Sequence, residues 1–170
     1  MNNVILIGMP GCGKSTVGVL LAKNLGYSFI DSDLLIQQKE GRKLQDILNT
    51  DGIEYFGRLE NEVNGSLDLI QTVVATGGSA VYWPESMAHL KSLGTVVYLK
   101  VPFEEIEKRI QNFESRGIVV PEGKTFYDVF LERSALYEKY ADIVIEERPG
   151  EEIWANCLRI TDAIIESENE

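Results

Sequence analysis

The sequence predicts an α/β fold in which a five-stranded parallel sheet is covered by helices on both faces. Short apolar segments typical of buried strands alternate along the 170 residues with segments of helical periodicity, which is the pattern of such a sheet. A glycine-rich loop, Gly8–Thr16 (GMPGCGKST), joins the first strand to the first helix. The chain contains no internal repeat and no linker-like tract, so we expect one domain over residues 1–170.

The first strand is the apolar run Val4–Ile7, which ends at Gly8. The helix after the loop carries apolar side chains at helical spacing, namely Val17, Leu20, Leu21 and Leu25. Gly26 gives this helix its stop signal. Tyr27–Ile30 is predicted as the second strand, which ends at Asp31.

The central part of the chain is predicted to be mainly helical. Helical segments are expected at Leu34–Glu40, Leu44–Leu48 and about Ile53–Ile70. Thr72–Ala75 is the third strand and runs into Gly77 and Gly78. A helix at Met87–Leu93 precedes the fourth strand, Thr95–Leu99.

The last third of the chain begins with a predicted helix at Phe103–Gln111. Residues Asn112–Lys124 show neither helical nor strand periodicity and contain glycine and proline, so we expect a mobile loop. Thr125–Tyr140 is predicted to be helical, Asp142–Glu146 to be the fifth strand, and Glu151–Glu166 to be a closing amphipathic helix.

Three of these strands are followed by residues that suit a ligand. Gly8, Asp31 and Gly77 each come just after a predicted strand. Ligands of open parallel sheets bind outside the carboxyl ends of the strands. We therefore expect the three positions to converge on one site.

The glycine-rich loop matches the phosphate-binding pattern G-x-x-x-x-G-K-[ST], which a random chain of this length matches with a probability of roughly 1% or less. Its backbone N–H groups and the N-terminus of the next helix would surround a β-phosphate. Lys14 is expected to reach the β- and γ-phosphates, and the Ser15 hydroxyl to coordinate Mg²⁺. Cys12 is either a small filler of the loop or a thiolate at the helix N-terminus. The expected nucleotide contacts of the loop are Gly11, Cys12, Gly13, Lys14, Ser15 and Thr16.

Two carboxylates, Asp31 and Asp33, follow the second strand. They could have separate roles, one facing Mg²⁺ and the other a hydroxyl nucleophile. The same pattern is equally typical of a helix N-cap followed by an acidic first turn. Phosphoryl transfer also needs charge neutralisation, which directs attention to Arg109, Arg116 and Arg133. Taken singly, each of these arginines is more typical of a solvated surface charge.

The composition of the chain argues against some classes of binding partner. The formal net charge of -11 argues against nucleic acid, because phosphate backbones favour a basic protein face. No apolar run reaches the length of a membrane span, and we expect neither a signal peptide nor a membrane partner. The two cysteines cannot form a disulfide framework, so we expect a reduced cytoplasmic protein. We also expect a monomer.

The order and spacing of these motifs resemble the shikimate kinase family over nearly the whole chain. The resemblance rests on GMPGCGKST, FIDSD, the FxRxE-like segment Phe56–Glu60, ATGGSAV, the arginines at 109 and 116, and the Arg133-x3-Tyr137 pair. It implies a P-loop kinase fold with a substrate-binding subdomain at about residues 32–62 and a lid at about 112–124. It also implies ATP-dependent, Mg²⁺-supported phosphorylation of a hydroxyl of shikimate, giving shikimate 3-phosphate in aromatic amino acid biosynthesis.

The resemblance also implies catalytic roles at the matching positions. Lys14, Asp33 and Arg116 would be catalytic. Asp33 would orient or deprotonate the hydroxyl, and Arg116 would close from the lid onto the phosphates. Asp31 would support Mg²⁺ through water, near Ser15.

Binding roles carry over in the same way. Arg109 and Arg148 would flank adenine, and Arg133 would bind the substrate carboxylate. The implied substrate contacts are Asp33, Phe56, Gly57, Gly77, Gly78, Ser79 and Arg133.

The departures from the family pattern are concentrated around the substrate. Gly57 stands where the family has an arginine that joins Arg133 in holding the carboxylate, and Ser79 replaces a third glycine. The lid sequence is Arg116-Gly117-Ile118-Val119 instead of Arg-Pro-Leu-Leu. Shikimate binding could then be weak, another cation could substitute, or the acceptor could be a different hydroxylated metabolite. A nucleotide-binding module without phosphoryl transfer is a third alternative, although such a module needs none of Asp33, Arg116 and Arg133.

Overall fold

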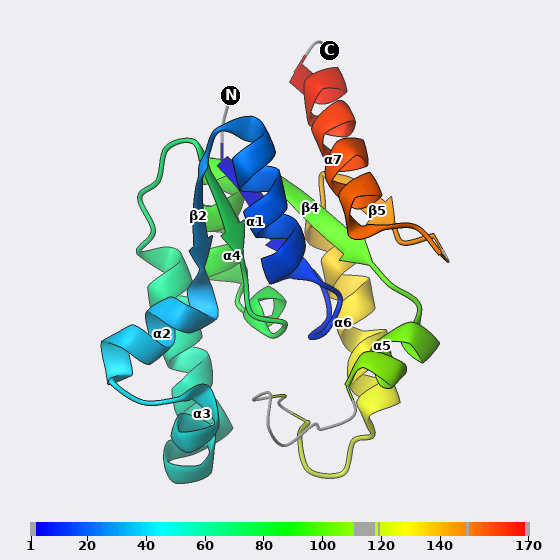
Figure 1. Ribbon diagram of the computed structural model, residues 1–170. Helices are drawn as coiled ribbons and strands as arrows, with labels where there is room; N and C mark the ends of the chain where they lie inside the picture. The colour runs from blue at the N-terminus through cyan, green and yellow to red at the C-terminus, as the bar shows by residue number, and fades with distance from the viewer. Residues whose placement is uncertain (1–2, 111–117, 119, 149, 169–170) are drawn as a thin grey trace.

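The computed structural model describes residues 3–110, 118, 120–148 and 150–168. Five parallel strands form one sheet in the order β2-β3-β1-β4-β5 (Figure 1), which confirms the predicted parallel sheet. The strands are β1 (Asn3–Ile7), β2 (Ser28–Asp31), β3 (Thr72–Ala75), β4 (Gly94–Lys100) and β5 (Ile143–Glu146). The central β1 pairs with β3 on one side, Val4 opposite Val73, and with β4 on the other, Val4 opposite Thr95.

Helices cover both faces of this sheet (Figure 1). The helices are α1 (Lys14–Leu25), α2 (Ser32–Glu40), α3 (Leu44–Gly65), α4 (Pro84–Leu93), α5 (Phe103–Arg109), α6 (Phe126–Tyr140) and α7 (Ile153–Glu168). Helices α1 and α7 pack against each other on one face, while α4 and α6 contact β4 from the other. None of the helices in the described part of the chain is both long enough and apolar enough to cross a membrane.

Burial follows the position of each strand in the sheet. Every residue of β1 and β3 is buried, whereas the edge strands β2 and β5 contain exposed positions. A second, smaller core joins α2 to α3 through Ile36, Ile47, Phe56, Leu59 and Val63. Because these two helices have a core of their own, they form a compact lobe beside the carboxyl end of the sheet.

Several predicted boundaries are wrong in the central region. The break predicted between Leu44–Leu48 and Ile53 is present, because the α3 span consists of two helical stretches that meet at a kink at Gly52, where φ is 80° and ψ is 177°. This helix ends at Gly65 and not at Ile70, whose side chain is 83% exposed. A short 3-10 helix, η1 (Ala80–Tyr82), was not predicted, and α4 begins at Pro84 instead of Met87.

The predicted lid, Asn112–Lys124, is described only at residues 118 and 120–124. Ile118 lines a cavity at the carboxyl ends of the strands. Residues 121–124 form a turn in which the Lys124 N–H donates to the Pro121 carbonyl over 3.1 Å. Arg116, the lid residue expected to be catalytic, lies outside the described residues.

Candidate active site

A cavity of about 710 Å³ lies at the carboxyl ends of the strands. It extends from the glycine-rich loop to α3 and α6, and it contains most of the predicted site. The predicted residues that line it are Gly11, Gly13, Lys14, Ser15, Thr16, Asp31, Asp33, Phe56, Gly77, Gly78, Ser79, Arg109 and Arg133. Residues from six separate parts of the chain are therefore brought together because the carboxyl ends of parallel strands share one edge of the sheet.

The glycine-rich loop places Lys14 at the inner end of the loop. The Lys14 side chain is buried, and its Nζ donates to the carbonyls of Gly8 and Met9 over 2.7 and 2.9 Å. Phosphate oxygens are stronger partners for an ammonium group than carbonyls. Cys12 is buried in the loop with its Sγ 3.7 Å from Lys14 Nζ and does not line the cavity, which matches the small-filler interpretation.

Ser15 and Asp31, the two expected metal ligands, are in direct contact. Ser15 Oγ donates to Asp31 Oδ2 over 2.6 Å, and Asp31 Oδ1 accepts the Asp33 N–H over 3.0 Å. Asp31 is therefore the N-cap of α2 and also contacts Ser15 of the phosphate loop, so the N-cap role is confirmed and is compatible with the predicted metal role. Two oxygens beside a phosphate site fit Mg²⁺, which usually binds one or two protein ligands together with phosphates and water.

Asp33 and Glu60 approach each other across Gly77. A Cβ atom built on Gly77 would collide with Glu60 Oε1 and would lie 2.8 Å from Asp33 Oδ1, so only glycine fits between these carboxyl groups. Burial and the charge of Asp31 raise the pKa of Asp33 to about 6, although Lys14 opposes this shift. No described group hydrogen-bonds Asp33 Oδ1.

Glu60 is a buried acidic residue of the site to which the sequence analysis assigned no role. It is 0% exposed, and its Oε2 accepts a hydrogen bond from Ser79 Oγ over 2.7 Å. Burial, together with the nearby Asp33, raises the pKa of Glu60 to about 8, so this side chain is neutral below that pH. The only sequence signal was its place at the end of the FxRxE-like segment.

Arg133 lines the cavity from α6, and Gly78 lies between it and Pro10 of the phosphate loop. It is 2% exposed, and its guanidinium lies 5.4 Å from the centre of the Tyr82 ring. A Cβ atom on Gly78 would lie 3.2 Å from Arg133 Nη1. One turn along α6, the Tyr137 hydroxyl donates to the Gly78 carbonyl over 2.5 Å. Helix α6 thus fixes both the arginine and the glycine turn that it faces.

Gly57 does not face this cavity. It lines a separate side pocket of about 430 Å³ together with Trp83, and a Cβ atom built on it would lie 2.5 Å from Trp83 Cζ2. The indole therefore occupies the space into which any side chain at position 57 would begin. This explains why a helix interior position tolerates glycine, at a cost of about 1 kcal/mol relative to alanine.

We expect Gly57→Arg to lower the free energy of unfolding by about 1–3 kcal/mol, because the new side chain must displace the indole. The cost should be smaller when the substitution is made in a Trp83→Ala background, where the space is open. Urea unfolding of both single variants and the double variant measures this coupling. Equal costs in the two backgrounds would contradict the assigned contact.

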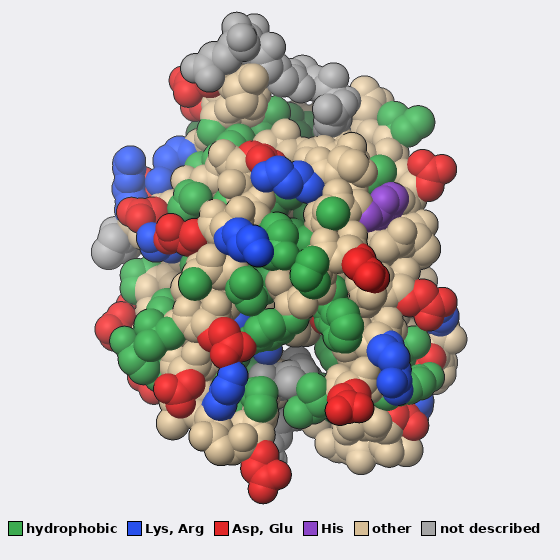
Figure 2. All heavy atoms as spheres, turned by 180° about the vertical axis from the view of Figure 1, so that it is seen from behind, with side chains coloured by type: hydrophobic (Ala, Val, Ile, Leu, Met, Phe, Trp, Pro, Cys, Tyr) green, Lys and Arg blue, Asp and Glu red, His purple; other side chains and the backbone are tan. Residues whose placement is uncertain are grey.

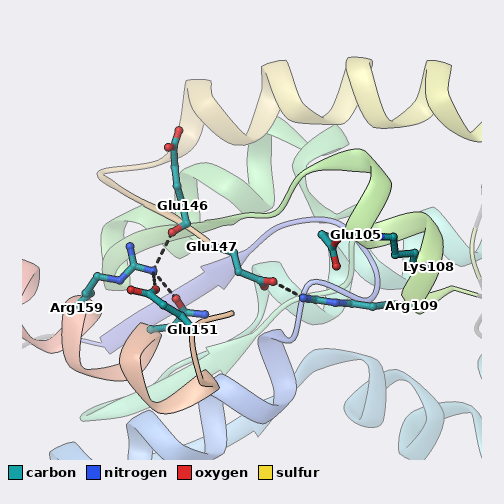
Figure 3. Close-up of polar contacts among 8 residues, drawn as sticks. Glu105, Lys108, Arg109, Glu146, Glu147, Glu151 and Arg159 are labelled. Carbon is teal, nitrogen blue, oxygen red and sulfur yellow. Dashed lines mark hydrogen bonds and ion pairs between the residues drawn. The ribbon is translucent and has the colours of Figure 1, made fainter. Parts of the chain in front are cut away.

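Ion pairs join α5 and α7 to the segment after β5 (Figure 3). Arg109 reaches the cavity and pairs with Glu147. Arg159 of α7 donates to the Glu146 carbonyl and to Glu151, each over 2.8 Å, and so holds the same segment. Arg148 is 68% exposed, lies 3.5 Å from Glu151 and does not line the cavity. Of the two arginines expected to flank adenine, the structure brings only Arg109 to the site.

Comparisons with known proteins agree with this geometry. A family model for shikimate kinase matches residues 10–164. A shikimate kinase from Persephonella marina is 38% identical over 146 residues, covering 85% of this chain and 88% of the relative. Shikimate kinase 2 of Dickeya chrysanthemi is 35% identical over 148 residues, covering 84% and 86%.

Solved structures show the same similarity. The shikimate kinase from Acinetobacter baumannii, in complex with shikimate, superposes with a TM-score of 0.91 at 31% identity, covering all of this chain and 96% of the other. The shikimate kinase from Aquifex aeolicus gives a TM-score of 0.79 at 29% identity, covering 98% of each chain.

Proposed function

The chain belongs to the shikimate kinase family, and from this premise we propose that it transfers the γ-phosphoryl group of ATP to a hydroxyl of shikimate, giving shikimate 3-phosphate. One observation carries the proposal: a single cavity joins a phosphate loop to a buried carboxylate, Asp33, and a buried arginine, Arg133. A module that only senses nucleotide needs no such acceptor end. The chain is thus an ATP-dependent small-molecule kinase.

At the nucleotide end, the backbone N–H groups of the loop and the N-terminus of α1 bind the phosphates, with Lys14 at the β and γ positions. Ser15 and Asp31 would hold Mg²⁺, Asp31 through water, and the ion would neutralise charge that develops during transfer. Arg109 would contact the adenine, and Arg148 would reach it only if the segment after β5 moves. Arg116 would add positive charge from the lid.

At the acceptor end, Asp33 orients the hydroxyl and accepts its proton. A pKa near 6 leaves Asp33 ionised at neutral pH and more basic than an ordinary aspartate. Glu60 is neutral below about pH 8, so it does not place a second negative charge beside Asp33. Arg133 binds the carboxylate of the acceptor, while Phe56, Gly77, Gly78 and Ser79 border its ring.

A different hydroxylated metabolite remains the second candidate, because one specific observation favours it. The position that carries a second arginine in the family pattern is Gly57, and it opens onto a side pocket with apolar walls instead of the acceptor cavity. A charge-assisted hydrogen bond contributes roughly 1.5–3 kcal/mol. With Arg133 alone we expect a KM for shikimate at the upper end of the usual range, about 1 mM.

The test is ADP release with Mg-ATP and either shikimate or a panel of polyols, sugars and hydroxy acids. We expect ADP release that depends on shikimate and saturates with it. The same mixture without an acceptor measures background hydrolysis. Robust turnover of another alcohol, with none of shikimate, would replace shikimate as the acceptor and leave the kinase assignment in place.

We also propose a monomer in a reducing compartment such as the cytoplasm. Cys12 and Cys157 are both buried free thiols, which suits such a compartment. Acidic and basic side chains are interspersed on the face seen in Figure 2, in keeping with small-molecule partners rather than nucleic acid.

A further inference from the structure

The side pocket beside the acceptor cavity is large enough for a ligand of its own. Its volume of about 430 Å³ lies within the usual range for small-molecule sites, roughly 300–1,000 Å³. Segments of α3, η1 and α6 line it. Figure 2 shows the surface hollowed at the lower centre, between the two lower lobes of the molecule.

The pocket walls are mainly aromatic and apolar. Phe56, Tyr82 and Trp83 supply three rings, and Ile53 and Pro121 supply aliphatic surface. Because Gly57 has no side chain, the backbone of α3 runs directly beneath the Trp83 indole. A flat apolar group is the kind of ligand that such walls favour.

The inner end of the pocket carries a buried cation. Arg133 lines the pocket there and is 2% exposed, and the Tyr82 ring lies beside its guanidinium. The other charged side chains that line the pocket are Glu54, Arg58 and Glu132, which are exposed, and the buried Glu60. Glu132 is paired with Lys124 over 2.5 Å. A carboxylate is the natural partner of the buried guanidinium.

The side pocket and the acceptor cavity share part of their walls. Phe56, Glu60, Ser79 and Arg133 line both, whereas no residue of the phosphate loop lines the side pocket. A ligand that places a carboxylate on Arg133 from the side pocket therefore takes the group that would bind the acceptor. It leaves the nucleotide end open.

We propose that the side pocket binds small flat aromatic monocarboxylates, with the ring against Trp83 and the carboxylate on Arg133, and that this binding excludes the acceptor but not ATP. The exclusion of the acceptor rests on the proposed function, whereas binding to the pocket does not. The pocket thereby gives the enzyme an inhibitory site for aromatic acids.

Phenylacetate is the probe, and phenylacetamide is its uncharged control. In assays of ADP release, we expect phenylacetate at twice its inhibition constant to raise the apparent KM for shikimate about threefold with kcat unchanged. It should leave the apparent KM for ATP unchanged, and phenylacetamide should inhibit at least about tenfold more weakly. Inhibition that is competitive with ATP, or equal inhibition by the amide, would overturn the proposal.

Substituting each of the two tryptophans of the chain in turn distinguishes binding in the side pocket from binding elsewhere on the surface. Trp83→Leu should raise the inhibition constant of phenylacetate about tenfold through loss of ring contact, whereas Trp154→Leu, on the exposed part of α7, should leave it unchanged. Equal effects of the two substitutions would count against the site.

Direct binding needs no turnover. In a Trp154→Phe variant, Trp83 is the sole tryptophan, and we expect its fluorescence to change with phenylacetate in a saturable manner. No change up to a concentration of about 20 mM, the weak limit for a fragment of this size, would overturn the proposal. Because this assay contains no shikimate, failure of the kinase assignment and failure of the pocket assignment are told apart.

Discussion

Replacing Lys14 with alanine should lower kcat about 10³-fold, the scale of a lost cationic group at a transferring phosphoryl. Lys14 is the buried ammonium group of the phosphate loop, held by the Gly8 and Met9 carbonyls at hydrogen-bond distance. Without the Lys14 ammonium group, the Gly8 and Met9 carbonyls would face the negative phosphates with no positive charge between them. Steady-state ADP release with saturating shikimate measures the loss.

The same substitution should weaken nucleotide binding. A ligand at a hundred times its Kd stabilises the native state by about 2.7 kcal/mol, which appears as a rise in Tm. We expect Mg-ADP to raise the Tm of the parent protein and to raise that of Lys14→Ala much less. Lys23→Ala, an exposed lysine in the last turn of the same helix, is the matched control and should behave like the parent. Turnover of Lys14→Ala within a factor of about ten of the parent would contradict this role.

The sheet and the phosphate loop were predictable because their signals are local. A short apolar run such as Val4–Ile7 is typical of a strand in a sheet covered on both faces, and the phosphate-binding pattern directly after it favours a strand over a buried helix. Asp31 and Asp33 were predictable for the same reason, since Asp31 ends the second strand and Asp33 lies two residues beyond it. Segment boundaries were less predictable. Leu67 and Ile70 both lie beyond the end of α3, where Leu67 is buried and Ile70 is exposed, so an apolar residue at helical spacing need not belong to the helix.

The residues that sequence reasoning missed or misplaced depend on contacts between distant segments. Glu60 is one acidic residue among several on α3, and only packing against Gly77 and Ser79 makes it part of the site. Gly57 looks like the loss of an arginine, and nothing near it in sequence identifies Trp83 as the group that fills its space. Arg148 was carried over by resemblance, yet its exposed side chain lies outside the cavity.

Asp33→Asn should lower kcat about 10²-fold or more while leaving the Tm shift with Mg-ADP nearly intact, because an amide cannot accept the proton of the hydroxyl. Asp31→Asn should instead weaken the response to Mg²⁺, since its carboxylate contacts Ser15 at the proposed metal position. Asp68→Asn, an exposed aspartate beyond α3, is the control and should have no effect. Full activity of Asp33→Asn would show that this residue serves only the first turn of α2.

The pH dependence of Asp33→Asn gives the residue a signature that lost packing would not produce. For the parent, kcat/KM should rise with pH up to about 6 as Asp33 ionises, and this acidic limb should be absent in Asp33→Asn. The free energy of unfolding of the parent should instead fall as the pH rises. Because the folded-state pKa is raised from 3.8 to about 6, the native state binds this proton more tightly than the unfolded state, so Asp33 reduces the free energy of unfolding as pH rises through that window.

Asp33→Asn should therefore lose less stability than the parent between about pH 4 and 6, while Asp68→Asn follows the parent. Urea unfolding at several pH values measures this difference. A variant that is less active yet relatively more stable above pH 6 is the expected result for a carboxylate kept in an unfavourable buried position because catalysis requires it. Parallel losses of activity and stability at every pH would mean that Asp33 contributes to packing and not to proton transfer.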